Sequence, residues 1–201
     1  KMPYNLNFIE ASSVPHVAET AWQALYPHGE LRAEQKVLIH GAAGAVGAYA
    51  VQFAHLTGAE VLATASGKDI EFVKSLGADK VIDYKTQDFT QEFAGVDLVL
   101  SLVGGDTEEK SYSIMKEGGR LVSTVGISHA DSARSREIIP IAMVISQAGE
   151  DLERITGLIA SGKVKTDIAV VDPLEEAVTG WKALSGDSSV ERPGHGKIVL
   201  E

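Results

Sequence analysis

Three glycines at equal spacing are the residues of this chain whose pattern points most directly to chemistry. Gly41, Gly44 and Gly47 form the pattern G-x-x-G-x-x-G. A turn that opens a helix leaves backbone N–H groups without partners, and together with the helix dipole these groups attract a phosphate. Glycines keep side chains away from a ligand lying on such a turn. The pattern predicts a phosphate or pyrophosphate site, and a plain turn packed on a sheet is the alternative interpretation.

The residues on either side of the glycines supply the context that such a site needs. Residues 37–39 form a short apolar run, typical of a buried parallel strand. After the glycine turn, the apolar residues Val46, Ala50 and Phe53 recur at helical spacing. The order strand, glycine turn, helix start is therefore expected, with Gly47 allowing the helix to pack closely on the strand.

Similar strand patterns alternate with helical patterns along the chain. Further strands are expected at residues 60–65, 80–84, 96–103, 120–125 and 138–145, and helices at residues 68–76, 88–94, 107–116 and 150–159. This alternation implies right-handed crossovers and a parallel sheet covered on both faces. We therefore predict an α/β fold, a doubly wound parallel six-stranded sheet of the Rossmann type, with strand order 3-2-1-4-5-6.

The two ends of the chain depart from this rhythm. Residues 8–25 hold two short helical patterns separated by Pro15, and they lead directly to the first strand. Beyond the sixth strand, a strand over 164–171, a helix over 173–184 and a strand over 194–200 exceed what the sheet needs. We expect a connector at 1–30, a nucleotide-binding domain at 31–162, and a C-terminal segment at 163–201 that returns toward another domain. The polar stretch 185–196 is expected to be a mobile loop.

Composition excludes several classes of partner. The 201 residues include 28 acidic and 18 basic side chains, a net charge of −10, which argues against a nucleic-acid partner. The absence of cysteine excludes disulfides and thiolate metal ligands within this chain. Neither a membrane-spanning run nor a signal peptide is visible in the sequence, so no membrane association is expected, and the location is expected to be cytoplasmic, with an organelle matrix as the alternative.

The end of the second strand indicates which dinucleotide would bind. Sites that prefer NAD usually place Asp or Glu there to bind the ribose 2′-hydroxyl. Here Ser66 and Lys68 follow the strand, with no carboxylate before Asp69, and these types suit a 2′-phosphate. Tyr84, at the end of the neighbouring strand, could reach the same corner. NADPH is therefore favoured over NADH. The alternatives are Ser66 as a helix N-cap, Lys68 as a solvated helix residue and Tyr84 as a packed strand end.

Several segments together resemble the medium-chain dehydrogenase/reductase superfamily, in particular its zinc-independent quinone oxidoreductase (zeta-crystallin-like) branch. The resemblance covers nearly the whole chain. It rests on residues 11–15 (ASSVP), 20–25 (TAWQAL), 37–47 (VLIHGAAGAVG), 50–54 (AVQFA), 76–79 (LGAD), 82–84 (IDY), 96–97 (VD), 103–106 (VGGD) and 196–200 (GKIVL).

The resemblance implies roles for individual residues around NADPH. The pyrophosphate would be held by Ala43, Gly44, Ala45 and Val46, beside Gly41. The 2′-phosphate would be held by Ser66, Lys68 and Tyr84, and the nicotinamide half by Val103 and Gly126. Thr20 would lie near the nicotinamide carboxamide. The implied reaction is hydride transfer to a small-molecule quinone or α,β-unsaturated carbonyl. In this family a GroES-like catalytic domain precedes the part seen here, so no catalytic residue is assigned and the chain alone is expected to be poorly active.

Three hypotheses stay open, of which the NADPH-binding part of a quinone or enone reductase is the first. A zinc-dependent alcohol dehydrogenase relative would need metal ligands, for which His16 and Glu19 are the nearby candidates, but no metal is expected. His40 is expected to be a strand-end residue and not an acid or base. A non-catalytic NADPH-sensing or crystallin-like module is the third. The apolar edge strand that begins at Ile138 and ends at Ile145 could pair with its copy in a homodimer, which Pro140 permits at an edge.

Overall fold

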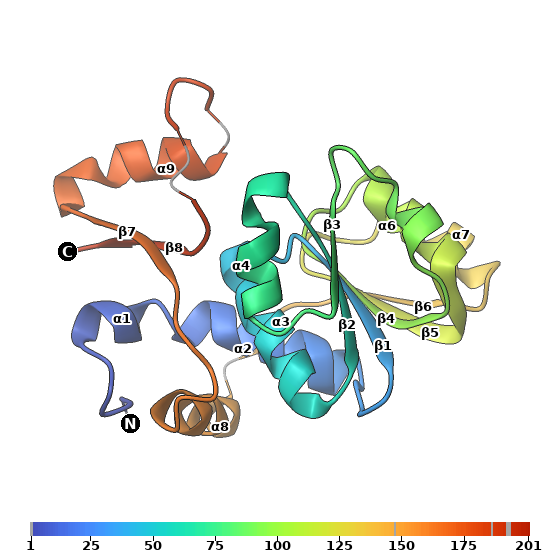
Figure 1. The fold of residues 1–201 in the computed structure, drawn as a ribbon, viewed down its shortest axis with the longest axis horizontal. Coiled ribbons are helices and arrows are strands. Elements are labelled where there is room, and N and C mark those ends of the chain that lie inside the picture. The colour runs from blue at the N-terminus through green and yellow to red at the C-terminus, as the bar shows by residue number, and fades with distance from the viewer. Residues whose placement is uncertain (1, 147, 186, 192–193) are drawn as a thin grey trace.

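A six-stranded parallel sheet forms the centre of the computed structural model, which describes residues 2–146, 148–185, 187–191 and 194–201 (Figure 1). The strands are β1 (Lys36–His40), β2 (Glu60–Ala65), β3 (Lys80–Asp83), β4 (Val96–Ser101), β5 (Met115–Ser123) and β6 (Ile139–Ala142). They lie in the order β3-β2-β1-β4-β5-β6, and each neighbouring pair is parallel. The predicted fold class and strand order are confirmed.

Both faces of this sheet are buried. Because successive side chains of a strand point to opposite faces, Val37 and Ile39 of β1 enter one hydrophobic cluster and Leu38 enters the other. The first face is covered by α2 (Pro15–Gln23), α3 (Ala45–Thr57), α4 (Ile70–Ser75) and α8 (Gly149–Ala160), and the second by α5 (Phe89–Glu92), α6 (Asp106–Ser111) and α7 (Ala130–Arg134). The short apolar strands of the sequence are thus explained by two-sided burial.

The helix expected over 107–116 is shorter than predicted. It ends at Ser111, a 3-10 turn follows over Tyr112–Ile114, and β5 begins at Met115. Tyr112 and Ile114 are both buried, so their spacing reflects a tight turn onto the sheet and not a continuing helix. β6 is likewise shorter than the apolar run that predicted it.

The N-terminal segment packs against the first face of the central sheet. Two helices, α1 (Phe8–Ser12) and α2, are separated next to Pro15 as expected, and a π-helical turn (Ala24–His28) follows α2. Val17 and Ala21 of α2 belong to the first hydrophobic cluster, so this segment shares the main core.

The C-terminal segment forms a separate small unit. A two-stranded parallel sheet pairs β7 (Ile168–Asp172) with β8 (Lys197–Leu200), and a 3-10 turn (Leu174–Glu176) and α9 (Ala177–Ser185) lie between them. Figure 1 shows this unit beside α4 and apart from the main sheet. The expected mobile loop at 185–196 includes residues 186, 192 and 193, which lie outside the described residues. The division at 1–30, 31–162 and 163–201 stays a prediction.

β7 begins four residues later than the strand predicted at 164. Val164 is buried in the first cluster, and the backbone of Lys165 is hydrogen-bonded by the Gln52 side chain of α3. Gln52 Nε2 donates to the Lys165 carbonyl oxygen at 3.1 Å, and the Lys165 N–H donates to Gln52 Oε1 at 2.8 Å. Strand pairing starts only after this anchor.

Candidate functional site

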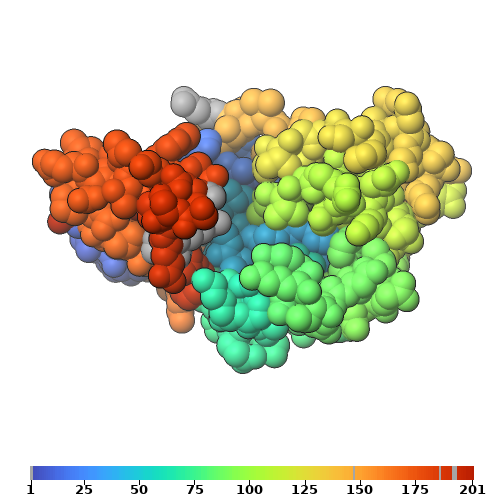
Figure 2. Space-filling model, turned by 90° about the horizontal axis from the view of Figure 1, so that it is seen from above, coloured from blue at the N-terminus to red at the C-terminus, as the bar shows by residue number. Residues whose placement is uncertain are grey.

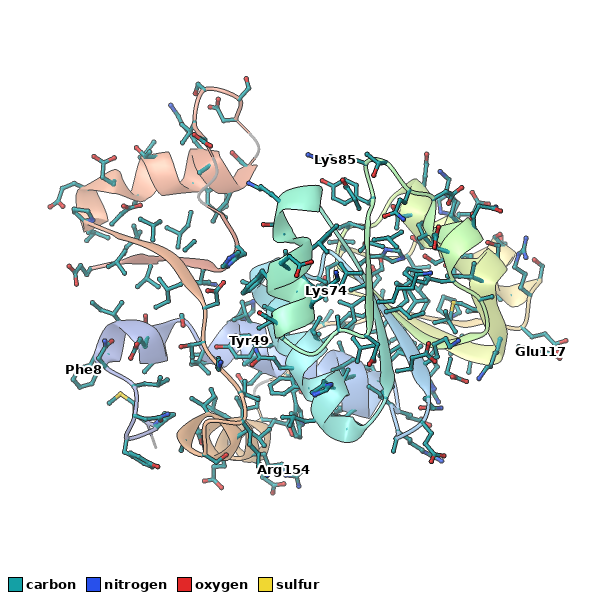
Figure 3. All side chains as sticks on the ribbon, viewed as in Figure 1. Phe8, Tyr49, Lys74, Lys85, Glu117 and Arg154 are labelled. Carbon is teal, nitrogen blue, oxygen red and sulfur yellow. The ribbon has the colours of Figure 1, made fainter. Side chains whose placement is uncertain are left out.

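A cavity of about 1000 Å³ opens at the carboxyl ends of the central strands. Its walls come from the loops after β1, β2, β3, β4 and β5, and from Gly194 and His195 of the C-terminal segment. The space-filling view shows the surface hollowed between that segment and the opposite loops (Figure 2). This edge, where the strand order reverses at β1 and β4, is where doubly wound sheets bind their ligands.

The glycine turn forms the floor of the cavity. Gly41 has a φ of +74°, a conformation that glycine adopts without strain. A Cβ added to Gly47 would lie 2.3 Å from the Gly41 carbonyl oxygen, so only glycine allows α3 to approach the turn this closely. Among the described residues, no side chain caps the start of α3 at Gly44, and Ala45 and Val46 line the cavity. The first N–H groups of α3 are therefore left for a ligand.

Nine of the eleven residues predicted from the sequence line this one cavity. They are Gly41, Ala43, Gly44, Ala45, Val46, Ser66, Lys68, Tyr84 and Val103. Thr20 and Gly126 are not part of its lining. The Thr20 hydroxyl donates to the His16 carbonyl oxygen within α2 at 2.6 Å, and Gly126 lies beyond Thr124, which does line the cavity. The roles of all eleven stay predictions.

The corner after β2 holds a carboxylate that the sequence did not place there. A 3-10 turn over Gly67–Asp69 brings Asp69 into the cavity wall, where it accepts a hydrogen bond from the Ser66 hydroxyl. Ser66 occupies the N-cap position of this turn with an extended backbone, as the alternative interpretation expected, but its hydroxyl makes no capping bond to a backbone N–H. Tyr84 is 58% exposed and is not a packed strand end. The corner thus combines Lys68 and Tyr84 with the carboxylate of Asp69, and the Asp83 carboxylate lies against the same turn, where a Cβ at Gly67 would be 2.8 Å from Asp83 Oδ2.

Two further lysines, which sequence reasoning did not single out, also line the cavity. Lys85 follows Tyr84 after β3, and Lys110 lies on α6, on the other side of β1. Both are exposed, and both are far from Lys68 in sequence. The signal for Lys85 was available, since it directly follows a strand end, whereas Lys110 is one of many charged residues on a short helix.

His40 ends β1 in a fully satisfied buried position. Its Nδ1 lies 3.1 Å from the Thr64 hydroxyl and its Nε2 lies 3.0 Å from the Ser111 hydroxyl. Because the Ser111 hydroxyl donates to the Thr107 carbonyl oxygen at 2.6 Å, it accepts from His40, which puts the proton on Nε2. Burial lowers the pKa of His40 to about 3. His40 is therefore a neutral ring that joins β1, β2 and α6 in the wall of the cavity.

A buried carboxylate holds the loop after β5. Glu108 is 1% exposed and accepts hydrogen bonds from the N–H groups of Ser128 and His129 and from the Tyr112 hydroxyl. Burial acts to raise the pKa of Glu108, but these donors outweigh it, so the pKa lies below its usual value. Gly126 is in the loop that these bonds fix.

Metal ligands do not gather anywhere in the part of the chain that the structure describes. No group of three His, Cys, Asp or Glu residues there could hold an ion. His16 is exposed and Glu19 is buried in α2.

Comparisons with known proteins agree with this fold and site. A family model described as zinc-binding dehydrogenase matches residues 76–200. A probable zinc-binding oxidoreductase, mitochondrial, of Arthroderma benhamiae is 31% identical, with 100% of this chain and 64% of that protein covered. An NADPH-dependent alkenal/one oxidoreductase, chloroplastic, of Arabidopsis thaliana is 35% identical, with 85% of this chain and 41% of that protein covered. The solved quinone oxidoreductase from Coxiella burnetii has a TM-score of 0.90 at 33% identity, with 98% of this chain and 62% of that chain covered.

The chain belongs to the medium-chain dehydrogenase/reductase superfamily, within the zinc-binding dehydrogenase family. It spans less than two thirds of the length of the three relatives named above. Among the described residues, no helix combines the length and apolar composition that crossing a membrane requires.

Proposed function

We propose that this chain binds NADPH in the cavity, as the cofactor-binding portion of an oxidoreductase that transfers hydride to a quinone or an α,β-unsaturated carbonyl. The observation that carries the proposal is the uncapped start of α3, which opens into the cavity behind the Gly41 turn. A helix start of this kind suits the bridging phosphates of a dinucleotide.

The turn fits that group sterically. A Cβ at Gly44 would lie 3.3 Å from the Gly41 carbonyl oxygen, so the turn is tight and presents backbone to the ligand. Ala43 and Ala45 add only methyl groups to the floor. The pyrophosphate would lie against the N–H groups of Ala45 and Val46, where the helix dipole favours negative charge.

A preference for NADPH is supported by the cations of the cavity. Lys68, Lys85 and Lys110 all line it, and Tyr84 offers a hydroxyl beside them. Asp69 opposes a 2′-phosphate and Asp88 also lines the cavity, but the three ammonium groups outnumber these two carboxylates. The printed name of the Arabidopsis thaliana relative, an NADPH-dependent alkenal/one oxidoreductase, agrees with both the cofactor and the substrate class.

The nicotinamide, when bound, supplies the hydride. The chain's own residues bind and orient it. In the proposed pose Leu102 and Val103 after β4 provide apolar contacts for the nicotinamide half, and the Thr124 hydroxyl after β5 supplies a polar contact. Glu108 fixes the loop that follows Thr124, so this end of the cavity is held in one shape.

A charge placed at the helix start tests the proposal. Ala45→Asp adds a carboxylate where the pyrophosphate would lie, and Asp is well tolerated in a first helical turn. Ala94→Asp, at an exposed residue outside the cavity, is the matched control. We expect the parent and the control to bind NADPH at least about tenfold more tightly than NADH, and Ala45→Asp to bind neither. Equal binding of NADPH by all three proteins would refute the site.

Assembly and location belong to the same proposal. β6 is at the edge of the sheet, with Ile139 43% and Val144 83% exposed, which supports a homodimer that pairs this edge with its copy. A monomeric mass in solution would rule that dimer out.

We also propose that the full-length protein is zinc-independent and cytoplasmic. Metal analysis of that protein tests the first statement, and imaging of it in cells tests the second. The printed names of two relatives, one mitochondrial and one chloroplastic, do not support the cytoplasmic location.

A further inference from the structure

The C-terminal segment contributes a histidine to the wall of the cavity. His195 lines the cavity just before β8. Its Nδ1 lies 2.6 Å from Asp167 Oδ2, and its ring stacks on Phe72 of α4 with 3.5 Å between ring centres and 4° between planes. Among the described residues, its Nε2 has no hydrogen-bond partner. The ring is thus held on one edge and one face.

Strand pairing in the small sheet builds this arrangement. The register places Ile168 opposite Lys197, and the Lys197 N–H donates to the Asp167 carbonyl oxygen at 3.1 Å. Gly196 has a φ of +96°, and a Cβ there would lie 2.6 Å from Asp167 Oδ2. Glycine at 196 is therefore what allows the chain on either side to bring His195 and Asp167 together.

The pair is also tied to the helix that forms the floor of the cavity. Gln52 of α3, 6% exposed, holds the backbone of Lys165, two residues before Asp167. Ala45 and Tyr49 of α3 share a small closed pocket with Asp167. Burial, and then the charge of Asp167, raise the pKa of Tyr49. Asp167 therefore stands at a fixed place beside the start of α3.

We propose that His195 is a cofactor-binding residue whose Nε2 contacts a phosphate of the dinucleotide, and that Asp167 positions its ring. This inference rests on the proposed function. With Nδ1 donating to Asp167, Nε2 is the atom left for a ligand, and a charged imidazole donates from both nitrogens. His195 lines the same cavity as Ala45, Lys68 and Asp69, so the phosphate is either the bridging pair or the 2′-phosphate.

Binding measurements on substituted proteins test this role. NADPH, NADH and 2′,5′-ADP are titrated into the parent, His195→Gln, Asp167→Asn and a control, His16→Gln, whose side chain is exposed and outside the cavity. We expect His195→Gln to weaken NADPH binding about tenfold, Asp167→Asn about threefold, and the control less than about twofold. Thermal unfolding without ligand checks that each protein is folded. If His195→Gln does not fold, the binding measurements on Asp167→Asn test the proposal instead.

The three ligands distinguish the two phosphates. Equal weakening of NADPH and NADH assigns the contact to the bridging phosphates, and weakening of NADPH and 2′,5′-ADP alone assigns it to the 2′-phosphate. Folded variants that bind all three ligands as the parent does would overturn the inference while leaving the proposed function intact. A parent protein that binds no dinucleotide would instead defeat the proposed function itself.

Discussion

Asp69 offers the sharpest test of how this cavity distinguishes NADPH from NADH. Its carboxylate lies in the cavity wall and accepts the Ser66 hydroxyl. In the proposed pose the 2′-phosphate of NADPH occupies the same corner, so Asp69 both repels it and engages a hydroxyl that could bind it. Asp69→Asn removes the charge and keeps the shape and an acceptor oxygen for Ser66.

The size of the effect follows from the charges. Two unit charges about 4 Å apart interact by about 1 kcal/mol in water, and a phosphate monoester carries a charge of about −1.5 to −2. Asp69→Asn should therefore strengthen NADPH binding by about 1 to 2 kcal/mol, roughly 5- to 30-fold. NADH lacks the 2′-phosphate, and the carboxylate is suited to accept its 2′-hydroxyl, so its binding should be unchanged or weaker.

The assay is the ratio of the two dissociation constants, measured by the fluorescence of the reduced nicotinamide at fixed ionic strength. Lys68→Gln at the same corner should move the ratio the opposite way, by roughly fivefold. Asp131→Asn is the control for net charge, because the Asp131 side chain is 99% exposed and outside the cavity. If Asp69→Asn has the same ratio of NADPH to NADH dissociation constants as the parent, or binds NADH relatively more tightly than the parent does, Asp69 does not face the 2′-phosphate.

Two further predictions concern stability and pH. Glu108→Gln should cost about 1 to 3 kcal/mol at pH 7, because a Gln side chain cannot accept from all the groups that Glu108 serves. The folded-state pKa of Glu108 is depressed, so its contribution is present at neutral pH and is lost as the pH falls below about 4.5, its ordinary value. Urea unfolding should show the gap between parent and variant narrowing at pH 4, and a constant gap would contradict this. The pKa of His40 is about 3 in the folded protein against an ordinary 6.5. As the pH drops below about 6.5, the unfolded chain therefore protonates the imidazole while the folded protein does not, and the free energy of unfolding falls. Between pH 7 and 5 the parent should lose stability more steeply than His40→Gln, approaching about 1.4 kcal/mol per unit, and equal slopes would refute the assignment.

The central sheet was predictable because its signals are local. Runs such as 37–39 are apolar throughout, since both faces of a parallel strand are buried, and each is followed by a helical pattern. The right-handed crossover then leaves few possible strand orders. The glycine turn was predictable for the same reason, since the close approach of Gly47 to Gly41 is made within seven residues of chain.

What sequence reasoning missed depends on contacts between distant segments. β7 starts late because Gln52 captures Lys165, which is 113 residues further along the chain. His195 enters the cavity wall through the pairing of β7 with β8, and nothing near it in sequence signals a ligand. Asp69 was visible in the sequence, but the 3-10 turn that carries it into the wall was not. Patterns of a few residues do not encode such placements.

Two buried glutamines explain how segments outside the sheet become walls of one site. Gln23 of α2 accepts from the Ser146 N–H at 3.0 Å and donates to its carbonyl oxygen at 2.7 Å, which fixes the chain just after β6. Gln52 of α3 does the same for Lys165 after α8. Each amide matches the N–H and the C=O of one residue, so a backbone segment without a strand partner is satisfied by a buried side chain. Since α8 lies between these two anchors, the segment that leads to Asp167 is fixed relative to α3, and the wall that carries His195 is held beside the start of that helix.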